Sequence, residues 1–369
     1  MRVLITGANG FLGKNLHAHL REKDIETILF TREMSEKQLT RCLDGVDFVF
    51  HLAGVNRPND VFEFEVGNKE LTEKLCDAIR TSGRQIPVIY TSSIQAEADN
   101  PYGASKKAAE QALVALERDV GSPVYIYRLP NVFGKWSRPN YNSVVATFCY
   151  NVANNLEIQI SDPATILQLV YIDDVIADFL KLLSDRPAGV LRPEIAIGYT
   201  ISLGHLAEQI RTFKEGRELM CIEAVGVGLT RALYATYLSF LRPEQFSYSL
   251  PMHEDPRGRF VEVLKTKDSG QFSFFTAHPG ITRGGHYHHS KNEKFLVIQG
   301  NARFSFRHIV TKETYELFTD GMKPEVVETV PGWAHDITNI GSKEMIVMLW
   351  ANEIFDRQHP DTIPYKALI

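Results

Sequence analysis

The chain has 369 residues, of which 44% are hydrophobic and 23% charged, and its formal net charge is −5. This composition is typical of a globular protein, and the negative balance gives no sign of affinity for nucleic acid. The length exceeds that of one ordinary core, so two or three domains are expected. No apolar run approaches the roughly 20 residues that a membrane span needs, so we expect a cytoplasmic protein with no membrane partner. The four cysteines lie far apart without a C-x-x-C spacing, and we interpret them as buried thiols.

Glycines near the N-terminus indicate a dinucleotide-binding loop. A short apolar strand at residues 2–5 leads into Gly7, Gly10 and Gly13, and a helical pattern follows the loop. Phe11 and Leu12 complete this loop. Glycines at these positions allow a tight turn, close approach of the backbone to a pyrophosphate, and close packing of the helix on the strand. The helix N-terminus then faces the phosphates. We therefore predict that the chain begins with an α/β domain of the Rossmann type, a doubly wound parallel sheet.

The end of the second predicted strand, at residues 27–30, favours NADPH over NADH. Sites for NAD usually place Asp or Glu about 20 residues after the glycine loop, where the acid binds the ribose 2′-hydroxyl. This chain has Thr31 and Arg32 there, and a guanidinium suits a 2′-phosphate. The alternative is that Arg32 is an exposed arginine without a role.

The next predicted strand contributes a segment for close cofactor contact. This buried strand, at residues 47–51, ends in Leu52, Ala53 and Gly54. Small residues at this point let a cofactor lie against the backbone. We therefore include all three in the predicted cofactor site.

A helix and a fourth strand follow. The helix is predicted at residues 63–82 and carries Asn68 near its start. The strand, at residues 88–93, has hydroxyls at its C-terminal end, where open parallel sheets bind ligands. Its last residue, Ser93, precedes the next motif by nine residues.

A tyrosine and a lysine four residues apart are candidates for catalysis. Tyr102 and Lys106 fall on the first turn of a predicted helix, so that the phenol and the ammonium share one face. The positive charge is expected to lower the pKa of the phenol, which then donates a proton to a carbonyl or accepts one from an alcohol. The pattern Y-x-x-x-K is common by chance, and the alternative is a solvated helix face.

Residues 1 to about 190 resemble the extended short-chain dehydrogenase/reductases, especially those that act on nucleotide sugars. The resemblance is carried by the glycine loop, His51-Leu-Ala-Gly54, Asn68, Thr91-Ser-Ser93, Tyr102-x-x-x-Lys106, Arg128-Leu-Pro-Asn-Val-Phe-Gly134 and Leu169-Val-Tyr-Ile-Asp-Asp-Val175. The segment between the serines and the tyrosine departs from the family, because it lacks the V-Y-G that usually follows the serine.

This resemblance implies roles for individual residues. Tyr102 would be the general acid, and Lys106 would lower its pKa and bind the ribose of the cofactor. Ser93, or its neighbour Ser92, would hydrogen-bond the substrate carbonyl. The resemblance also implies two residues near the sugar nucleotide, Asn131 and Ser143.

A change in composition marks a second domain. Residues 200–240 have a mostly helical pattern, and residues 242–251 look like a linker. From residue 252 onward, short β-rich runs alternate with Gly, Pro, Asn and Asp, as in an all-β sandwich or barrel. We therefore predict a Rossmann domain at residues 1–243 and an all-β domain at residues 252–369.

Four residues of the second domain form a candidate metal site. His286 and His288 are two residues apart in a predicted strand and so share a face. Glu293 can return from the next strand, and His335 supplies a third imidazole. Two or three histidines with one carboxylate are a ligand set for a divalent transition metal that keeps open positions for a substrate oxygen. We therefore expect zinc at this site.

These segments resemble two related families. The spacings G-x5-H-x-H-x4-E-x6-G at residues 280–300 and P-G-x-x-H-x3-N at residues 331–339 resemble the two cupin motifs, which implies a jelly-roll fold. Asp255-Pro-Arg-Gly-Arg-Phe-Val-Glu262 and Arg283-Gly-Gly-His286 resemble the sugar-nucleotide 4-keto-6-deoxyhexose 3,5-epimerases, which are also cupins. In those enzymes, the histidine that matches His286 is the base that removes the proton beside the ketone, and no metal is needed.

The two resemblances compete for His286, because a ligated imidazole cannot also be a free base. The complete set of four ligands favours zinc, in which case another nearby group is the base. Without metal, His286 is the catalytic base. Arg257 and Arg283 are candidates for binding the nucleotide diphosphate, because guanidinium forks match phosphate oxygens. The alternative for both is ordinary charge on a strand surface.

The two predicted sites act on one functional group, a sugar ketone. A hydrogen beside that ketone is acidic only while the ketone is present, so epimerisation must precede reduction. A reductase domain followed by a cupin resembles the CapF-type bifunctional enzymes of bacterial capsular polysaccharide synthesis. This resemblance implies that the cupin epimerises C3 of a UDP-2-acetamido-2,6-dideoxy-4-hexulose and that the first domain reduces C4 with NADPH. The product would be UDP-2-acetamido-2,6-dideoxy-talose, a precursor of UDP-N-acetyl-L-fucosamine.

Two other functions stay open from the sequence. The first is a single-activity NADPH-dependent 4-ketoreductase whose cupin only oligomerises or binds sugar. The second is an NADP-responsive interaction protein without catalysis. Both domain types commonly self-associate, so we expect a dimer or a higher homo-oligomer.

Overall fold

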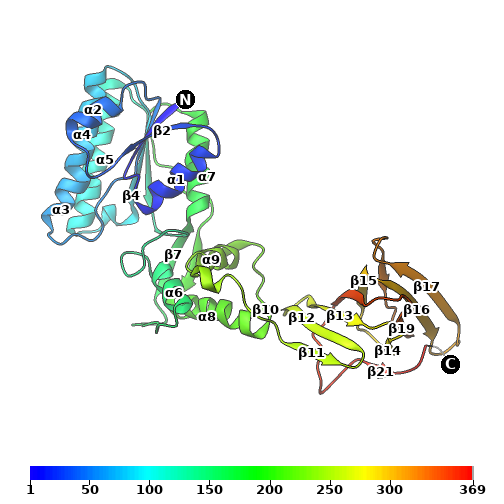
Figure 1. Cartoon of the computed structure of the whole chain (residues 1–369). Helices are drawn as coiled ribbons and strands as arrows, with labels where there is room; N and C mark the ends of the chain where they lie inside the picture. The colour runs from blue at the N-terminus through cyan, green and yellow to red at the C-terminus, as the bar shows by residue number, and fades with distance from the viewer. Residues whose placement is uncertain (368–369) are drawn as a thin grey trace. The chain divides into compact units, whose positions relative to one another are not determined.

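The computed structural model describes residues 1–367, which form two compact units (Figure 1). The first unit holds residues 1–211 and 227–241, and the second holds residues 212–226 and the chain from residue 242 onward. In the part of the chain that the structure describes, no helix is long and apolar enough to cross a membrane.

A parallel β-sheet forms the centre of the first unit. Its strand order is β2-β1-β3-β4-β5-β8, and each neighbouring pair is parallel. The order reverses between β1 and β3, and open α/β sheets bind ligands at such a point. The strands are β1 (Arg2–Thr6), β2 (Glu26–Phe30), β3 (Phe48–His51), β4 (Val88–Ser93), β5 (Val124–Leu129) and β8 (Val190–Leu191).

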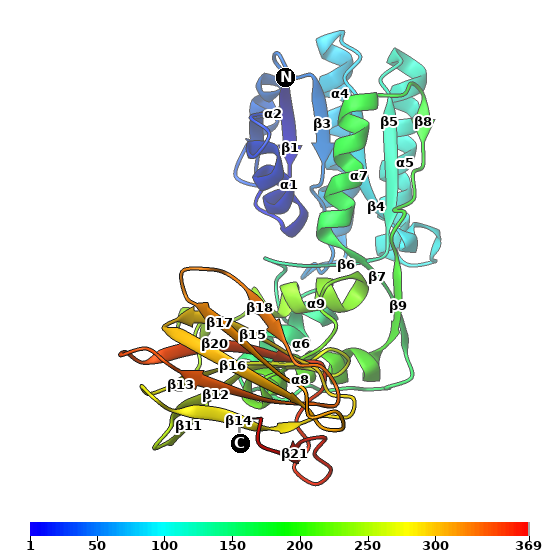
Figure 2. The ribbon, with the colours of Figure 1, turned by 90° about the vertical axis from the view of Figure 1, so that its right-hand side faces the viewer.

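Helices cover both faces of this sheet (Figure 2). On one face lie α1 (Phe11–Arg21) and α7 (Ile172–Asp185), and on the other lie α2 (Glu36–Cys42), α4 (Leu71–Ser82) and α5 (Pro101–Val120). Apolar residues of α4 and α5, among them Leu75, Ile79 and Leu113, pack on the sheet in one core. The doubly wound parallel sheet predicted from the sequence is thereby confirmed.

The segment predicted as one helix at residues 63–82 has three parts. α3 (Phe62–Phe64) is followed by a π-helical turn at Glu65–Glu70 and then by α4. A π-helical turn is rare and occurs mostly at functional sites. The hydrophobic period did not reveal it, because one extra residue in a turn barely changes the pattern of apolar positions.

A smaller sheet completes the first unit. β6 (Asn131–Phe133) runs parallel to β7 (Ile166–Tyr171), and β9 (Tyr199–Ser202) runs antiparallel to β7. The helices of this region are α6 (Val144–Ala153), α8 (Leu203–Leu219) and α9 (Gly228–Leu238), in agreement with the helical pattern of residues 200–240. The division between the two units falls within α8.

The second unit is built from mostly antiparallel strands. One sheet has the order β10-β12-β13-β20-β15-β18, with β11 beside β12, and another has the order β17-β16-β19-β14-β21. A core between them contains Phe275, Phe295, Phe304, Ile337 and Val347. The predicted all-β, cupin-like fold of this part is confirmed. Its strands are β10 (Cys221–Ile222), β11 (Met252–Asp255), β12 (Gly258–Thr266), β13 (Gly270–Ala277), β14 (Thr282–Tyr287), β15 (Glu293–Gln299), β16 (Asn301–His308), β17 (Thr314–Asp320), β18 (Val326–Glu328), β19 (Trp333–Asn339), β20 (Met345–Ala351) and β21 (Ile363–Pro364).

The segment at residues 242–251, which looked like a linker, belongs to the second unit. It contains a 3₁₀ turn at Pro243–Gln245, and Arg217 donates to the carbonyl of Gln245 at 2.5 Å. In addition, β10 pairs in parallel with β12. Part of the helical region therefore belongs to the all-β unit. The pairing of β10 with β12 is long-range, and composition does not indicate it.

Candidate active sites

The glycine loop between β1 and α1 lies where the strand order reverses. Gly7 has a φ of +68°, which favours glycine, and a Cβ at Gly7 would lie 2.7 Å from the backbone of Ala53. A Cβ at Gly13 would lie 2.3 Å from the carbonyl oxygen of Gly7. Glycine at both positions therefore lets the loop, β3 and α1 approach closely and leaves the N-terminus of α1 available to a phosphate.

A cavity of about 670 Å³ lies beside this loop, a size within the range of small-molecule and cofactor sites. Thr31, Arg32, Ala53 and Asn68 are not among its lining residues. The predicted residues that line it are Gly7, Gly10, Phe11, Leu12, Gly13, Leu52, Gly54, Ser92, Ser93, Tyr102, Lys106, Asn131 and Ser143.

Asn68 is buried in the π-helical turn and holds the loop after β3. Its amide oxygen accepts from the Val55 amide at 2.8 Å, and its amide nitrogen donates to the Val55 carbonyl at 3.1 Å. The same nitrogen donates to Ser105 Oγ at 2.9 Å. One side chain thus ties the loop that follows Gly54 to the first turns of α5, and it shapes the cavity through these neighbours.

His51 is part of a buried hydrogen-bond chain behind the cofactor loop. Its Nδ1 lies 2.7 Å from Thr6 Oγ1 and its Nε2 lies 2.8 Å from Thr72 Oγ1. Burial lowers the pKa of His51 to about 3, so the ring is neutral. This histidine therefore links β1, β3 and α4 and takes no part in proton transfer.

The start of α5 positions the tyrosine and the lysine. Asn100 caps the helix by accepting from the Gly103 amide at 2.8 Å. The hydroxyl of Tyr102 donates to Asn56 Oδ1 at 2.9 Å, and Lys106 Nζ donates to the carbonyl of Thr91 at 3.0 Å. Both side chains line the cavity, as the shared helix face predicts.

The pKa of Tyr102 is raised, whereas the sequence predicted that Lys106 lowers it. Burial of the phenol is the main cause, and a contact with the Ser93 hydroxyl opposes it. Burial also lowers the pKa of Lys106 to about 8, against an opposing effect of Glu110. The ammonium is itself buried and bound to a carbonyl, so it does not offset the burial of the phenol. Tyr102 therefore stays protonated near neutral pH, as a proton donor must be.

The two serines at the end of β4 have different partners. Ser92 donates to the buried carboxylate of Glu110 at 2.5 Å, and Arg128 donates to both oxygens of Glu110 at 2.9 and 2.7 Å. Ser93 accepts from the Gln95 amide at 3.2 Å and its hydroxyl contacts Tyr102. Ser92 is thus engaged in a buried network, which favours Ser93 as the partner of a substrate carbonyl.

Sequence reasoning missed much of the cavity wall formed by the loop between β6 and α6. Trp136, Arg138 and Tyr141 belong to this loop and line the cavity. The Arg138 guanidinium lies 5.2 Å from the centre of the Tyr141 ring. Aromatic rings and guanidinium groups are suited to stacking on a base and to pairing with phosphate. The signal was the aromatic and basic run Lys135-Trp-Ser-Arg138, directly after the family motif.

Asn131 and Ser143 flank this loop and also have structural roles. The amide nitrogen of Asn131 donates to the Gln168 carbonyl at 3.1 Å. Ser143 Oγ accepts from the Ala146 amide at 3.2 Å and caps α6. Both still line the cavity, so their placement is compatible with the predicted position near a sugar nucleotide.

Thr31 and Arg32 follow the end of β2. Arg32 is exposed, and Thr31 Oγ1 donates to the Glu33 carboxylate at 2.5 Å. Arg32 and Glu33 are therefore adjacent after the end of β2. At this point of the fold, a carboxylate would bind the ribose 2′-hydroxyl of NADH and a guanidinium would bind the 2′-phosphate of NADPH.

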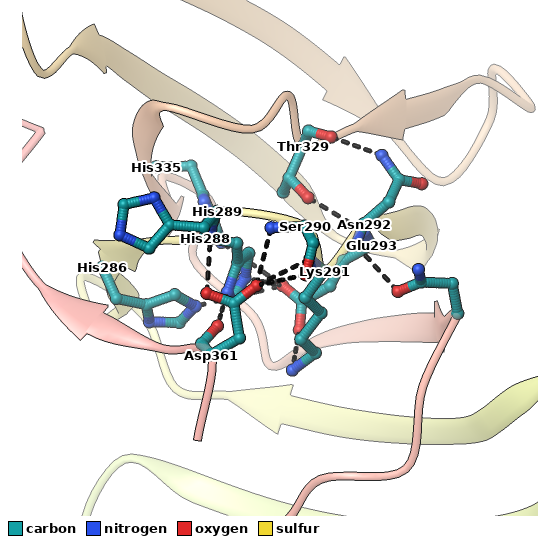
Figure 3. A network of polar contacts seen from close by, with 11 residues as sticks. His286, His288, His289, Ser290, Lys291, Asn292, Glu293, Thr329, His335 and Asp361 are labelled. Atoms are coloured by element: carbon teal, nitrogen blue, oxygen red, sulfur yellow. Dashed lines mark hydrogen bonds and ion pairs between the residues drawn. The ribbon is translucent and has the colours of Figure 1, made fainter. Parts of the chain in front are cut away.

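In the second unit, four side chains converge on one point (Figure 3). Ligand atoms of His286, His288, Glu293 and His335 all lie within 4.8 Å of one another. Glu293 Oε2 is 3.3 Å from His288 Nε2, 3.4 Å from His335 Nε2 and 3.9 Å from His286 Nε2. The register of β14 and β19 sets His286 directly opposite His335, so that both imidazoles share a face.

The hydrogen-bonding of this cluster fits a metal ion. Nδ1 of His288 faces the carbonyl oxygen of Asp361, so Nδ1 carries the hydrogen and the Nε2 lone pair points at Glu293. His288 Nε2 and both ring nitrogens of His335 are buried and have no hydrogen-bond partner. An imidazole lone pair beside a carboxylate oxygen requires a proton or a cation between them. Three imidazoles and a carboxylate are a common donor set for a divalent transition metal.

The charges at this cluster favour the protonation states that bind a metal, an ionised carboxylate at Glu293 and a neutral imidazole at His335. Burial by itself raises the pKa of Glu293, but the three imidazoles and Lys291 outweigh it and lower that pKa, so the carboxylate is ionised. Lys291 Nζ pairs with Oε1 of Glu293 at 2.9 Å, which leaves Oε2 for the imidazoles. Burial also lowers the pKa of His335, and a neutral imidazole is the form that binds a metal.

The two arginines predicted to bind a diphosphate both approach Asp255. Arg257 pairs with its carboxylate through Nε at 3.0 Å and Nη2 at 2.6 Å. Arg283 Nη2 lies 3.9 Å from the same carboxylate, and its Nε donates to the Thr276 carbonyl at 2.9 Å. Nη2 of Arg283 is buried without a hydrogen-bond partner. Asp255 therefore holds the guanidinium groups of Arg257 and Arg283 close together, and Nη2 of Arg283 still has hydrogens to donate.

Comparisons with known proteins cover the whole chain. The model of the NAD dependent epimerase/dehydratase family matches residues 3–198, and that of the polysaccharide biosynthesis C-terminal domain matches residues 253–363. The chain is 61% identical to UDP-2-acetamido-2,6-beta-L-arabino-hexul-4-ose reductase of Pseudomonas aeruginosa, over 98% of this chain and 98% of the relative.

Its structure resembles that of capsular polysaccharide assembling protein CapF from Staphylococcus aureus, with a TM-score of 0.92 and 42% identity. The match covers 99% of this chain and 100% of that protein. The chain belongs to the CapF family. UDP-glucose 4-epimerase of Thermotoga maritima, at 20% identity and a TM-score of 0.57 over 65% of this chain, shares the fold alone. CapF, in contrast, matches the Rossmann and the cupin-like parts together.

Proposed function

We propose that this chain is a bifunctional sugar-nucleotide enzyme that epimerises C3 of a UDP-2-acetamido-2,6-dideoxy-4-hexulose and then reduces C4 with NADPH. The product is UDP-2-acetamido-2,6-dideoxy-talose, which serves capsular polysaccharide synthesis. The observation that carries this proposal is the presence in one chain of two separate groups of side chains, each suited to one of these steps. One is the cavity with Ser93, Tyr102 and Lys106, and the other is the cluster of three histidines and Glu293.

In the reduction, NADPH when bound would supply the hydride that C4 of the ketone accepts. The N-terminus of α1 would hold the cofactor pyrophosphate, and the small residues after β3 would let the cofactor lie against the backbone. Ser93 donates a hydrogen bond to the carbonyl oxygen, and the hydroxyl of Tyr102 protonates the developing alkoxide. Lys106 supplies positive charge beside the cofactor ribose. The name of the 61% identical relative, a hexulose reductase, supports this half of the proposal.

In the epimerisation, the C3 proton leaves and returns on the other face of the sugar. The carbanion is stabilised as an enolate whose charge lies on the C4 oxygen. The cluster of His286, His288, Glu293 and His335 would hold zinc, which when bound supplies a Lewis acid for that oxygen. Another group of the second unit is then the base, and His286 is the base only if the site works without metal. Arg257 and Arg283 would bind the diphosphate.

Deuterium exchange tests the epimerase half directly. We expect that incubation of the protein with the 4-keto sugar nucleotide in D₂O, without NADPH, places deuterium at C3. The reason is that exchange needs the ketone and a base but no hydride. Mass spectrometry and NMR of the recovered sugar nucleotide measure the position and the extent of labelling. If no deuterium enters, the cupin-like unit is not an epimerase and the chain is a ketoreductase with a non-catalytic second unit.

Substitution of Arg32 tests the preference for NADPH. Arg32→Ala should raise the KM for NADPH by roughly 10- to 100-fold, because a charge-assisted hydrogen bond contributes about 1.5–3 kcal/mol. The KM for NADH should change little, since NADH has no 2′-phosphate. Arg41→Ala, at another exposed arginine in the neighbouring helix α2, is the matched control. Equal changes for both cofactors would show that Arg32 does not contact the 2′-phosphate.

The pH dependence of reduction should follow the charge of Lys106. Its pKa is lowered to about 8 by burial, so the ammonium is present below pH 8 and is lost as the pH rises through that value. The pKa of Tyr102 is raised, so the phenol stays protonated over this range. We expect kcat for NADPH oxidation to be flat between about pH 6 and 7 and to fall about tenfold per pH unit above 8. A rate that holds to pH 9.5 would contradict this role of the ammonium.

A further inference from the structure

Asp361 contacts the loop at residues 289–291, which lies between the candidate ligands His288 and Glu293. The proposed reactions do not use its carboxylate. Its carboxylate accepts from three consecutive amides, those of His289 at 2.8 Å, Ser290 at 2.7 Å and Lys291 at 2.8 Å. It also accepts from Ser290 Oγ at 3.0 Å. Consecutive amides that point at one oxygen pair form a concave anion site. The loop between two of the candidate ligands is therefore wrapped around one side chain from the far C-terminal part of the chain (Figure 3).

The main chain of Asp361 acts on a ligand directly. Its carbonyl oxygen accepts from His288 Nδ1, which fixes the tautomer and turns Nε2 toward Glu293. Histidines that bind metals usually donate their second nitrogen to a carbonyl or carboxylate in this way, and loss of such a partner typically costs 10- to 100-fold in metal affinity. Asp361 thus orients one imidazole through its carbonyl and the adjoining loop through its carboxylate.

The same segment also reaches the surroundings of the three other candidate ligands. The amide of Lys291 is held by Asp361, and the ammonium of Lys291 pairs with Oε1 of Glu293. Directly after Asp361, β21 pairs with β14, where Pro364 lies opposite His286. The Ala367 amide then donates to Asp336 Oδ2 at 3.2 Å, next to His335 in the chain. The segment from residue 361 to residue 367 therefore contacts the surroundings of each candidate ligand.

We propose that Asp361 is a positioning residue of the metal centre, and that the C-terminal segment it belongs to sets the metal affinity of the second unit. This inference rests on the proposed metal site, because it concerns the orientation of its ligands. Asp361 itself contacts neither substrate nor metal in this proposal. It acts only through His288 and the loop at residues 289–291.

The experiment compares zinc affinity in full-length variants. Zinc is removed with a chelator, and its dissociation constant is then measured by competition with a chromogenic chelator. Asp361→Ala and Asp361→Asn both keep the main-chain carbonyl that His288 Nδ1 contacts, so they test the carboxylate and its hold on the loop at residues 289–291. Asp361→Ala removes the contacts of the carboxylate with that loop and should raise the constant by roughly 10- to 100-fold. Asp361→Asn keeps one acceptor oxygen, so it should give a smaller rise. Asp356→Ala is the matched control, because Asp356 caps its own turn by accepting from the Gln358 amide at 2.8 Å and is exposed. It should change the constant by less than twofold.

A second readout separates positioning from folding. Cobalt(II) bound in place of zinc has an absorption spectrum that reports ligand geometry. In Asp361→Asn, we expect an altered cobalt spectrum, while the melting temperature of the metal-free protein matches the wild type. A wild-type zinc constant together with an unchanged cobalt spectrum in both Asp361 variants would overturn the inference. Failure of the wild-type protein to bind zinc would instead overturn the proposed metal site itself.

Discussion

Tyr102→Phe is expected to lower NADPH-dependent reduction of the 4-keto substrate by roughly 10²- to 10⁴-fold, the usual contribution of a positioned general acid. The ring and its packing stay, including the contact with Phe64 at a centroid distance of 5.5 Å, so the loss is confined to the hydroxyl and its hydrogen bond to Asn56. Deuterium exchange at C3 should stay at the wild-type rate, because it takes place in the other unit. Stopped-flow measurement of NADPH oxidation checks the reduction, and labelling in D₂O checks the exchange at C3.

A matched control for this variant lies in the same region. Tyr90→Phe also removes one phenolic hydroxyl, but that hydroxyl is buried without a hydrogen-bond partner, and its ring lies 4.9 Å from Lys106 Nζ. Reduction should therefore be retained in Tyr90→Phe. Loss of exchange together with reduction in Tyr102→Phe would contradict two separate sites, and full reduction by Tyr102→Phe would remove the tyrosine from the mechanism.

His335→Gln is expected to abolish metal binding and to lower exchange at C3 by roughly 10²- to 10⁴-fold, since a Lewis acid contributes several kcal/mol at an enolate oxygen. His335 suits this test because neither ring nitrogen has a hydrogen-bond partner, and the substitution removes the approach of Nε2 to Glu293 Oε2 at 3.4 Å. Elemental analysis should find about one zinc per wild-type chain and none in the variant. His278→Gln, at a half-exposed histidine of the same unit, is the control and should keep both zinc and exchange.

Mixing the two variants gives the decisive result. His335→Gln keeps the reductase cavity and Tyr102→Phe keeps the histidine cluster, so the mixture should convert the 4-keto substrate to the reduced, epimerised product that neither variant makes alone. This outcome requires that the epimerised ketone passes between molecules through solution. Zinc-free His335→Gln protein that still exchanges C3 at the wild-type rate would instead favour His286 as a metal-free base.

Local patterns in the sequence predicted both folds and most of the candidate cofactor-binding, catalytic and metal-ligating residues. The spacing of Gly7, Gly10 and Gly13 predicted a loop and a helix start that the structure has, and a Cβ at Gly7 or Gly13 would clash with the backbone there. The spacing of Tyr102 and Lys106 predicted one shared helix face. That of His286 and His288 predicted a shared strand face; the two imidazoles do come together, but β14 ends at Tyr287 and His288 lies just beyond it. Such groups are neighbours in the chain, so the regular geometry of a helix or a strand is enough to place them together.

Other features depend on contacts between residues that are far apart in the sequence, and only the tertiary structure decided them. The π-helical turn that buries Asn68, the hydrogen bond that engages Ser92 with Glu110, and the raised pKa of Tyr102 all follow from packing around these groups. Asp361 is 73 residues from His288 and belongs to no motif. Spacing determines which side chains share a face. Burial and long-range hydrogen bonds determine how those side chains are oriented and charged, and neither can be read from neighbours in the chain.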